Sequence, residues 1–208
     1  MSTKIGIISD VHATPEPVKE ALSIFQEEHV DLSICAGDIA GYGNELEQTL
    51  QLLVDSECQM ILGNHDLWFL DTAITKENKW IEDCYKNTPL TLDYLIEGKN
   101  IYVVHAHPPS SQVKGIKLLD EDGKLMPELK DQWQIEIDKY AYDVLIVGHT
   151  HQVYAEQLGS TLLINPGSTV FNHTCAILSL PDMEVEIFPL SNKEPLLAWN
   201  WGMNQIRA

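Results

Sequence analysis

Five short polar motifs, each directly behind an apolar run, set the strongest constraint on how this chain can fold. The apolar runs have the length and composition of β-strands, and the motifs hold six of the eight histidines. In an open α/β sheet, ligands bind outside the carboxyl ends of the strands. Motifs far apart in the sequence can therefore converge on one site. They occupy residues 10–12, 37–38, 63–66, 105–107 and 148–151.

The side chains in these motifs are those of a transition-metal site. They supply carboxylates, imidazoles and one amide oxygen but no thiolate, which suits Mn²⁺, Fe or Zn²⁺ and disfavours a sulfur-rich structural zinc site or an all-oxygen Ca²⁺ site. The candidate ligands are too many for one ion and enough for two ions that share a carboxylate, an arrangement suited to in-line displacement at phosphorus. The candidates are Asp10, His12, Asp38, Asn64, His105, His149 and His151.

In order and composition, the motifs resemble the five blocks of the calcineurin-like metallophosphoesterases. The blocks correspond to Asp-x-His at 10–12, Gly-Asp-x-x-Gly at 37–41, Gly-Asn-His-Asp at 63–66, the lone His105, and Gly-His-Thr-His at 148–151. Asn-Pro-Gly-Ser at 165–168 resembles a turn of the compact prokaryotic phosphodiesterase-type members. The resemblance implies the family fold, of class α/β: one domain over residues 1–208, a four-layer α/β/β/α sandwich of two mixed sheets flanked by helices.

The resemblance also implies which side chains hold which ion. Asp38 is expected to bridge two divalent transition-metal ions, with Mn²⁺ preferred and Fe, Zn²⁺ or Ni²⁺ as alternatives. The remaining ligands fall into two sets, Asp10, His12 and His151 for the first ion, and Asn64, His105 and His149 for the second.

The catalytic roles follow from the same resemblance. His65 is expected to act as general acid on the leaving group and Asp66 to orient it, while a hydroxide activated by both ions attacks phosphorus. Many family members have Asn where this chain has Thr14, a departure that leaves the metal ligands intact and affects only the surroundings of the first ion.

Two features beside the predicted site each have two interpretations. His107 is predicted to contact the substrate phosphate, and the alternative is a loop imidazole without a role. The segment 108–132, rich in Pro, Gly, Ser and charge, follows His105 and is predicted to cover the substrate. Its Lys114 and Lys117 either contact a phosphate or are ordinary solvated lysines.

The periodicity of apolar residues predicts three helices. One is opened by Pro15 and Pro17, one by Asn44 with Glu47 as an N-cap pair, and one lies between residues 76 and 86. The first helices alternate with strands at 5–8, 32–36 and 60–62, which is the pattern of a parallel sheet. Short apolar runs at 161–164, 176–180 and 185–188 predict a second, more antiparallel sheet in the C-terminal part.

Composition limits the class and the partners. With 208 residues, 44% of them hydrophobic, the chain can bury one full core. Its net charge of −18 disfavours duplex nucleic acid, whereas bound ions can still attract a small phosphoester substrate. The four cysteines have no paired spacing, and neither a membrane span nor a signal peptide is evident. We therefore expect a cytoplasmic protein without a membrane partner, and a homo-oligomer is an open alternative to a monomer.

Together these features predict a metal-dependent phosphoesterase that hydrolyses small phosphodiesters or nucleotides. A protein or small-molecule phosphomonoesterase is the alternative within the same chemistry. The alternative from another class is a non-catalytic scaffold subunit of the same fold, but such subunits lack the histidine that stands here as His65. The C-terminal Trp199, Trp201 and Met203 either pack on the domain or form a subunit contact, and the sequence does not decide between these.

Overall fold

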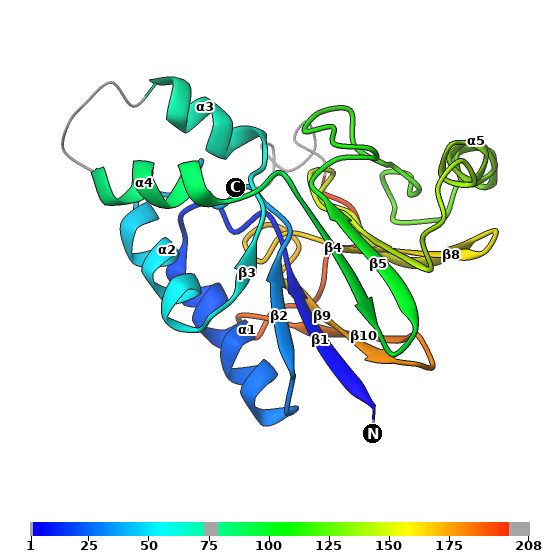
Figure 1. Ribbon diagram of the computed structural model, residues 1–208, viewed down its shortest axis with the longest axis horizontal. Helices are drawn as coiled ribbons and strands as arrows, with labels where there is room; N and C mark the ends of the chain where they lie inside the picture. The colour runs from blue at the N-terminus through cyan, green and yellow to red at the C-terminus, as the bar shows by residue number, and fades with distance from the viewer. Residues whose placement is uncertain (1, 73–78, 200–208) are drawn as a thin grey trace.

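The computed structural model describes residues 2–72 and 79–199. Within these ranges, two five-stranded mixed sheets pack face to face, and helices cover the outer side of each sheet (Figure 1). This is the expected α/β/β/α sandwich. None of the helices in the described ranges is long and apolar enough to cross a membrane.

The first sheet has the strand order β10-β9-β1-β2-β3. Its parallel strands β1 (Thr3–Ile8), β2 (Leu32–Cys35) and β3 (Gln59–Met60) are the three predicted from the N-terminal half. β9 (Thr174–Leu180) pairs antiparallel with β1, and β10 (Glu184–Pro189) pairs antiparallel with β9. The C-terminal strands therefore extend the first sheet.

The second sheet has the order β4-β5-β6-β8-β7. Its central strands β5 (Lys99–Val104), β6 (Val144–Ile146) and β8 (Thr161–Pro166) are parallel, and the edge strands β4 (Thr91–Ile96) and β7 (Val153–Leu158) are antiparallel to their neighbours. The prediction that the three C-terminal runs form the second sheet is wrong for two of them. β9 is buried along nearly its whole length, so it needs a position covered on both faces, and the place beside β1 provides one.

Three helices agree with the sequence prediction in position. α1 (Pro15–Glu27) begins at the predicted proline, and α2 (Leu46–Asp55) begins two residues after Asn44. The predicted Asn44–Glu47 cap is wrong, because Glu45 is the N-cap residue and makes no side-chain capping bond. α4 (Lys79–Asn87) is the third predicted helix, and residues 76–78 of that prediction lie outside the described residues.

Two further helices were not predicted. α3 (Asn64–Thr72) buries the polar residues Asn64 and Asp66, and α5 (Pro127–Ile137) buries only Ile137. Neither helix therefore has the apolar periodicity by which an amphipathic helix is recognised. The predicted loop 108–132 ends inside α5 as a consequence.

β1 lies between two layers of the core. Ile5 and Ile7 face the second sheet, and Ile8 faces the helices of the first. A Cβ on Gly6, between Ile5 and Ile7, would lie 2.6 Å from the Phe25 ring. The missing side chain therefore lets α1 pack directly on the strand. This tight packing fixes the carboxyl end of β1, from which the first motif continues.

Candidate metal centre

The loops that follow β1, β2, β3, β5 and β6 bring the predicted ligands together. Within the described residues, three groups of His and Asp have ligand atoms that all lie within 4.8 Å of one another. One group consists of the residues predicted for the first ion, a second joins the predicted bridge Asp38 to two histidines predicted for the second ion, and the third shares members with both. The groups are Asp10, His12 and His151; Asp38, His105 and His149; and His12, Asp38 and His65.

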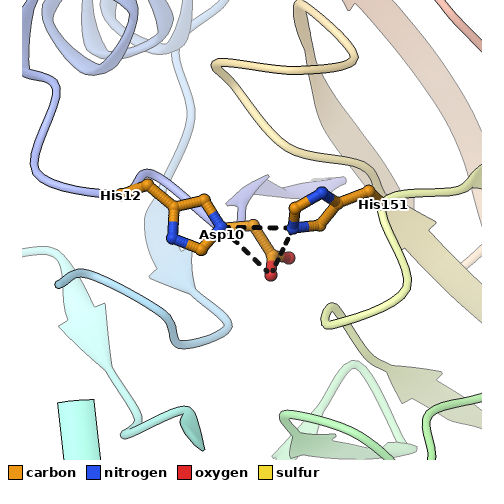
Figure 2. A group of neighbouring side chains, drawn as sticks. All are labelled: Asp10, His12 and His151. Carbon is orange, nitrogen blue, oxygen red and sulfur yellow. Dashed lines mark hydrogen bonds and ion pairs between the residues drawn. The ribbon is translucent and has the colours of Figure 1, made fainter. Parts of the chain in front are cut away.

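The first group is drawn in Figure 2. Nε2 of His151 lies 3.1 Å from Nε2 of His12 and 3.3 Å from Oδ1 of Asp10. The other carboxylate oxygen of Asp10 accepts from the Ser9 hydroxyl at 2.6 Å and from the His149 backbone N–H at 3.0 Å. The same N–H is also 3.2 Å from Oδ1, so the surrounding chain holds the whole carboxylate while Oδ1 faces the two imidazoles.

Backbone carbonyls fix the tautomers of two histidines. Nδ1 of His12 donates to the Ala40 carbonyl at 3.1 Å, and Nδ1 of His105 donates to the Ala36 carbonyl at 2.8 Å. In the neutral ring the remaining Nε2 then carries the lone pair, which is the state that binds a metal. Both Nε2 atoms point into the cluster, because they lie near carboxylates of Asp10 and Asp38.

The second group surrounds Asn64. Its amide oxygen lies 2.8 Å from Nδ1 of His149, 3.3 Å from Nε2 of His105 and 3.1 Å from the Gln112 carbonyl oxygen. With both rings neutral, the amide turned by 180° would donate to the same three atoms. A cation among these lone pairs would instead favour the oxygen-inward orientation, so this set of donors fits a metal ion.

The protonation states of His12 and His149 suit metal binding, and that of His105 differs. Burial lowers the pKa of His12 to about 4, and burial together with the charge of His105 lowers the pKa of His149 to about 4. Burial also disfavours charged His105, but the carboxylate of Asp38 outweighs it and raises the pKa of His105 to about 9. In the metal-free protein at neutral pH, His105 therefore holds the proton and the other two rings are neutral.

The backbone at the site is strained. The residues with left-handed φ include Asp10 (52°), His12 (45°), Asp38 (53°), His149 (65°) and His151 (48°). A non-glycine residue in this region costs roughly 1–3 kcal/mol, and such residues cluster at functional sites. The strain aims side chains from short loops at one point, which regular strand or helix geometry does not do.

His65 belongs to the third group, with His12 and Asp38, and to neither of the other two. Its backbone N–H donates to Oδ1 of Asp38 at 2.9 Å, and its ring centroid is 4.8 Å from both the Tyr42 ring and the Trp68 ring. All four residues line a cavity of about 570 Å³. The His65 imidazole therefore lies in the cavity next to the other candidate ligands.

Asp66 makes contacts beyond its predicted role. Its buried carboxylate accepts the backbone N–H groups of Ile39, Ala40 and Gly63, at 3.2, 2.7 and 2.8 Å. These bonds tie together the turns that carry Asp38 and Asn64. These bonds give Asp66 a structural role that the sequence did not indicate, and its orientation of the His65 ring stays a prediction.

His107 differs from its predicted role. Its Nδ1 lies 2.8 Å from the Pro108 carbonyl oxygen, its ring is 5.7 Å from that of Trp133, and it is not among the described residues that line the cavity. This placement does not support the prediction that His107 contacts the substrate.

Several cavity residues were missed in the sequence. Tyr42 immediately follows Gly41 of the second motif, and Trp68 lies one helical turn after His65, so a prediction of α3 would have found it. Phe171, which is not among the described residues that line the cavity, stacks on the His151 ring with centroids 5.1 Å apart. Trp199 also lines the cavity, and its backbone N–H donates to the His151 carbonyl at 3.0 Å, so Trp199 packs on the domain. Trp201 and Met203 lie outside the described residues.

Comparison with known proteins agrees with this geometry. The family model described as the calcineurin-like phosphoesterase superfamily domain matches residues 3–182. The chain belongs to this superfamily. All five motif loops lie inside the matched region, so the superfamily domain includes the whole candidate metal centre.

Two relatives of this calcineurin-like phosphoesterase come from Methanocaldococcus jannaschii. This chain is 26% identical to a phosphodiesterase from that organism over 169 residues, which cover 79% of this chain and 82% of the relative. It is 28% identical to a probable metallophosphoesterase over 186 residues, 88% of this chain and 76% of the relative. A metallophosphoesterase structure from Sphaerobacter thermophilus shares the fold, with a TM-score of 0.67, 20% identity, and coverage of 92% of this chain and 89% of that one.

Proposed function

We propose that this calcineurin-like phosphoesterase hydrolyses small phosphodiesters or nucleotides with the help of two divalent metal ions. One observation carries the proposal: two ligand groups, each of one carboxylate and two imidazoles, lie side by side and are connected through Asp38. One ion would be held by Asp10, His12 and His151. The other would be held by His105, His149 and the Asn64 amide oxygen. Asp38 would be a ligand of both ions. The absence of sulfur from this set favours Mn²⁺, with Fe, Zn²⁺ or Ni²⁺ as alternatives.

When bound, a pair of divalent ions supplies Lewis acidity toward the phosphoryl oxygens and lowers the pKa of water, as in other two-metal phosphoesterases. The side chains of the protein then have separate tasks. Ser9 and the His149 N–H hold Asp10, and carbonyls hold the rings of His12 and His105, so the ligands are oriented before substrate arrives.

His65 is the proposed general acid. It lines the cavity together with the ligands, and its backbone is fixed by Asp38, so its imidazole can reach the ester oxygen that leaves. Protonation of that oxygen by a positioned imidazole avoids the release of a free alkoxide. The presence of this histidine also supports an enzyme over a scaffold subunit of the same fold.

The cavity supports a small substrate with a planar ring. Its volume of about 570 Å³ is within the range of small-molecule sites. Tyr42 and Trp68 are 59% and 54% exposed, and the centroid of each ring lies 4.8 Å from that of His65. Large exposed aromatic side chains at a concave site favour stacking with a ligand ring. A nucleoside or aryl group on the leaving side would use both rings.

The proposed setting is the cytoplasm. The described cysteines are all free, and Cys35, Cys58 and Cys175 are buried. Free buried thiols are typical of proteins from a reducing compartment.

A substrate screen tests the function. Purified protein, dialysed against chelator and then supplied with Mn²⁺, is assayed with bis-aryl phosphate, aryl monophosphate, cyclic nucleotides and dinucleoside polyphosphates. We expect metal-dependent hydrolysis of diesters in preference to the monoester. Faster hydrolysis of the monoester would establish the phosphatase alternative, and metal binding without hydrolysis of any ester would support the scaffold alternative.

A further inference from the structure

Lys114 and Lys117 lie on the wall of the cavity beside the second ligand group. A Cβ on Gly115 would lie 2.7 Å from the Cδ2 atom of His149, so the backbone between the two lysines passes directly over that imidazole. On the side of the first ligand group, the ring of Tyr42 lies 4.7 Å from that of His12. One wall of the cavity is thus aromatic and the other carries two lysines.

The charge of the lysine wall contrasts with that of the whole chain. The protein has 31 acidic and 13 basic residues, yet residues 98–119 contain no Asp or Glu. Among the described residues, the lysine–carboxylate ion pairs are made by other lysines, Lys4, Lys86, Lys99, Lys130 and Lys139. Lys114 and Lys117 therefore direct positive charge at the cavity without a carboxylate that neutralises it.

The wall is anchored to the body of the domain. The Ile116 carbonyl accepts from the Thr150 hydroxyl at 3.0 Å and from the Tyr154 hydroxyl at 2.9 Å, and the side chains of Ile116 and Leu118 are fully buried. The exposed lysines alternate with these buried residues. Because the backbone is fixed, both lysine side chains extend from the cavity wall before a ligand binds, and no ordering of the loop adds to the entropic cost of binding.

We propose that Lys114 and Lys117 form a second phosphate subsite, and that the preferred substrates are phosphodiesters with a further phosphate on the arm that is not released. This inference rests on the proposed phosphodiesterase function. A nucleotide with two separate phosphate groups is the chemical class that fits: one phosphate at the metal ligands, and one at the lysines. A lysine ammonium binds phosphate as a point charge through strong, charge-assisted hydrogen bonds.

Two esters with the same leaving group test the subsite. They are the 5′-p-nitrophenyl ester of thymidine 5′-phosphate and the same ester with an added 3′-phosphate. The readout is the ratio of their kcat/KM values with Mn²⁺-loaded protein. We expect the 3′-phosphate to raise kcat/KM by about tenfold or more, since a hydrogen bond to a charged group contributes on this scale. The ratio should fall to near unity in the Lys114→Met, Lys117→Met double variant and toward unity at high salt.

Lys124→Met is the matched control, because Lys124 follows on the same loop, is exposed and does not line the cavity. It should leave the ratio unchanged. If the ratio fell equally in Lys124→Met, the effect would be general electrostatic attraction and the subsite proposal would be wrong. Equal losses for both esters in the double variant would also overturn it, because the lysines would then contact the phosphate that is hydrolysed.

A binding measurement separates this inference from the proposed function. The metal-loaded protein is titrated with thymidine 3′,5′-bisphosphate and with thymidine 5′-phosphate. Tighter binding of the bisphosphate that is lost in the double variant would establish the subsite, even if neither ester were hydrolysed. Failure to hydrolyse either ester would refute only the phosphodiesterase function. Equal affinities would refute the subsite.

Discussion

The backbone N–H of His65 donates to Oδ1 of Asp38 at 2.9 Å, and the same oxygen lies 3.3 Å from Nε2 of His105. One carboxylate oxygen therefore contacts both the proposed general acid and a ligand of the second group. Asp38 also shares a potential ligand group with His12. Its position links the two proposed ion sites to each other and to the residue that faces the leaving group.

Asp38→Ala should reduce metal content more than any other single ligand change. It removes a ligand from both proposed ions, together with negative charge that offsets their repulsion. We expect reconstituted wild-type protein to hold about two Mn²⁺, Asp38→Ala to hold less than about one, and turnover to fall by more than roughly 100-fold. Elemental analysis after dialysis measures the content, with the exposed Asp182→Ala as control. Full retention of both ions in Asp38→Ala would show that the bridge is misassigned.

His65→Ala and Asn64→Ala should separate catalysis from metal binding at adjacent positions. Without a general acid, turnover should fall by roughly 10²–10⁴ for a diester with a ribose alkoxide leaving group. The loss should be much smaller for nitrophenolate, which leaves without a proton. Asn64→Ala should instead lower metal affinity, because it removes an amide oxygen that faces His105 and His149. Equal losses for both esters in His65→Ala would mean that this residue positions the phosphate or water.

The grouping of these His and Asp side chains could be predicted because each motif directly follows a strand. Asp10, His12 and His151 come from opposite ends of the matched region and still meet. The contacts of Asp66 could not be predicted, because they are hydrogen bonds to backbone atoms of another loop, and no motif indicates that the His107 ring turns to the carbonyl of its neighbour Pro108. A motif specifies which residue types are present but does not specify what each side chain contacts.

The fold could be predicted where apolar periodicity is strong. β1 and α1 are clear in the sequence, whereas α3 is hidden because its buried residues are polar. The sheet to which β9 belongs is a non-local property, set by its antiparallel register with β1, in which Ile5 is opposite Leu178. No local pattern distinguishes that partner from another strand with similar apolar residues.

Metal loading at pH 7 should release about one proton, since a ligand must lose its proton to bind a metal. The pKa of His105 is raised to about 9, so its ring is protonated at pH 7 in the metal-free protein, whereas His12 and His149, with pKa values near 4, are already neutral. Between pH 6.5 and 8.5, Mn²⁺ affinity should therefore rise about tenfold per pH unit and level off as pH passes about 9. Calorimetry in buffers of different ionisation enthalpy measures the proton; a pH-independent affinity would contradict the charge state of His105.

Trp68→Leu should weaken binding of ring-bearing esters. The Trp68 ring lies 4.8 Å from that of His65 and is 54% exposed, so its removal takes away a stacking surface without opening the core. We expect KM for a nucleotide diester to rise by roughly 5–10-fold, with a smaller change for a dialkyl phosphate. Trp80→Leu, an exposed tryptophan on α4 that does not line the cavity, is the matched control. Equal changes for both esters would exclude ring stacking as the role of Trp68.

Gln152→Ala should loosen the lysine wall while leaving the metal ligands in place. The Gln152 amide oxygen accepts the backbone N–H groups of Leu118 and Leu119 at 2.8 and 3.1 Å, and its nitrogen donates to the Leu119 carbonyl at 2.8 Å. Because these groups are buried, removal of their partner should cost about 2–3 kcal/mol and lower Tm by roughly 5–10 °C.

Amide exchange at residues 118 and 119 should accelerate in this variant, and the preference for a second phosphate should weaken, because the lysines are then less well placed. Metal content should stay at the wild-type level. Gln157→Ala is the control, since this exposed glutamine on β7 bonds only to the nearby Gly159 carbonyl among the described residues. If exchange accelerated while the phosphate preference stayed unchanged, a fixed backbone would not be needed for the lysines to act.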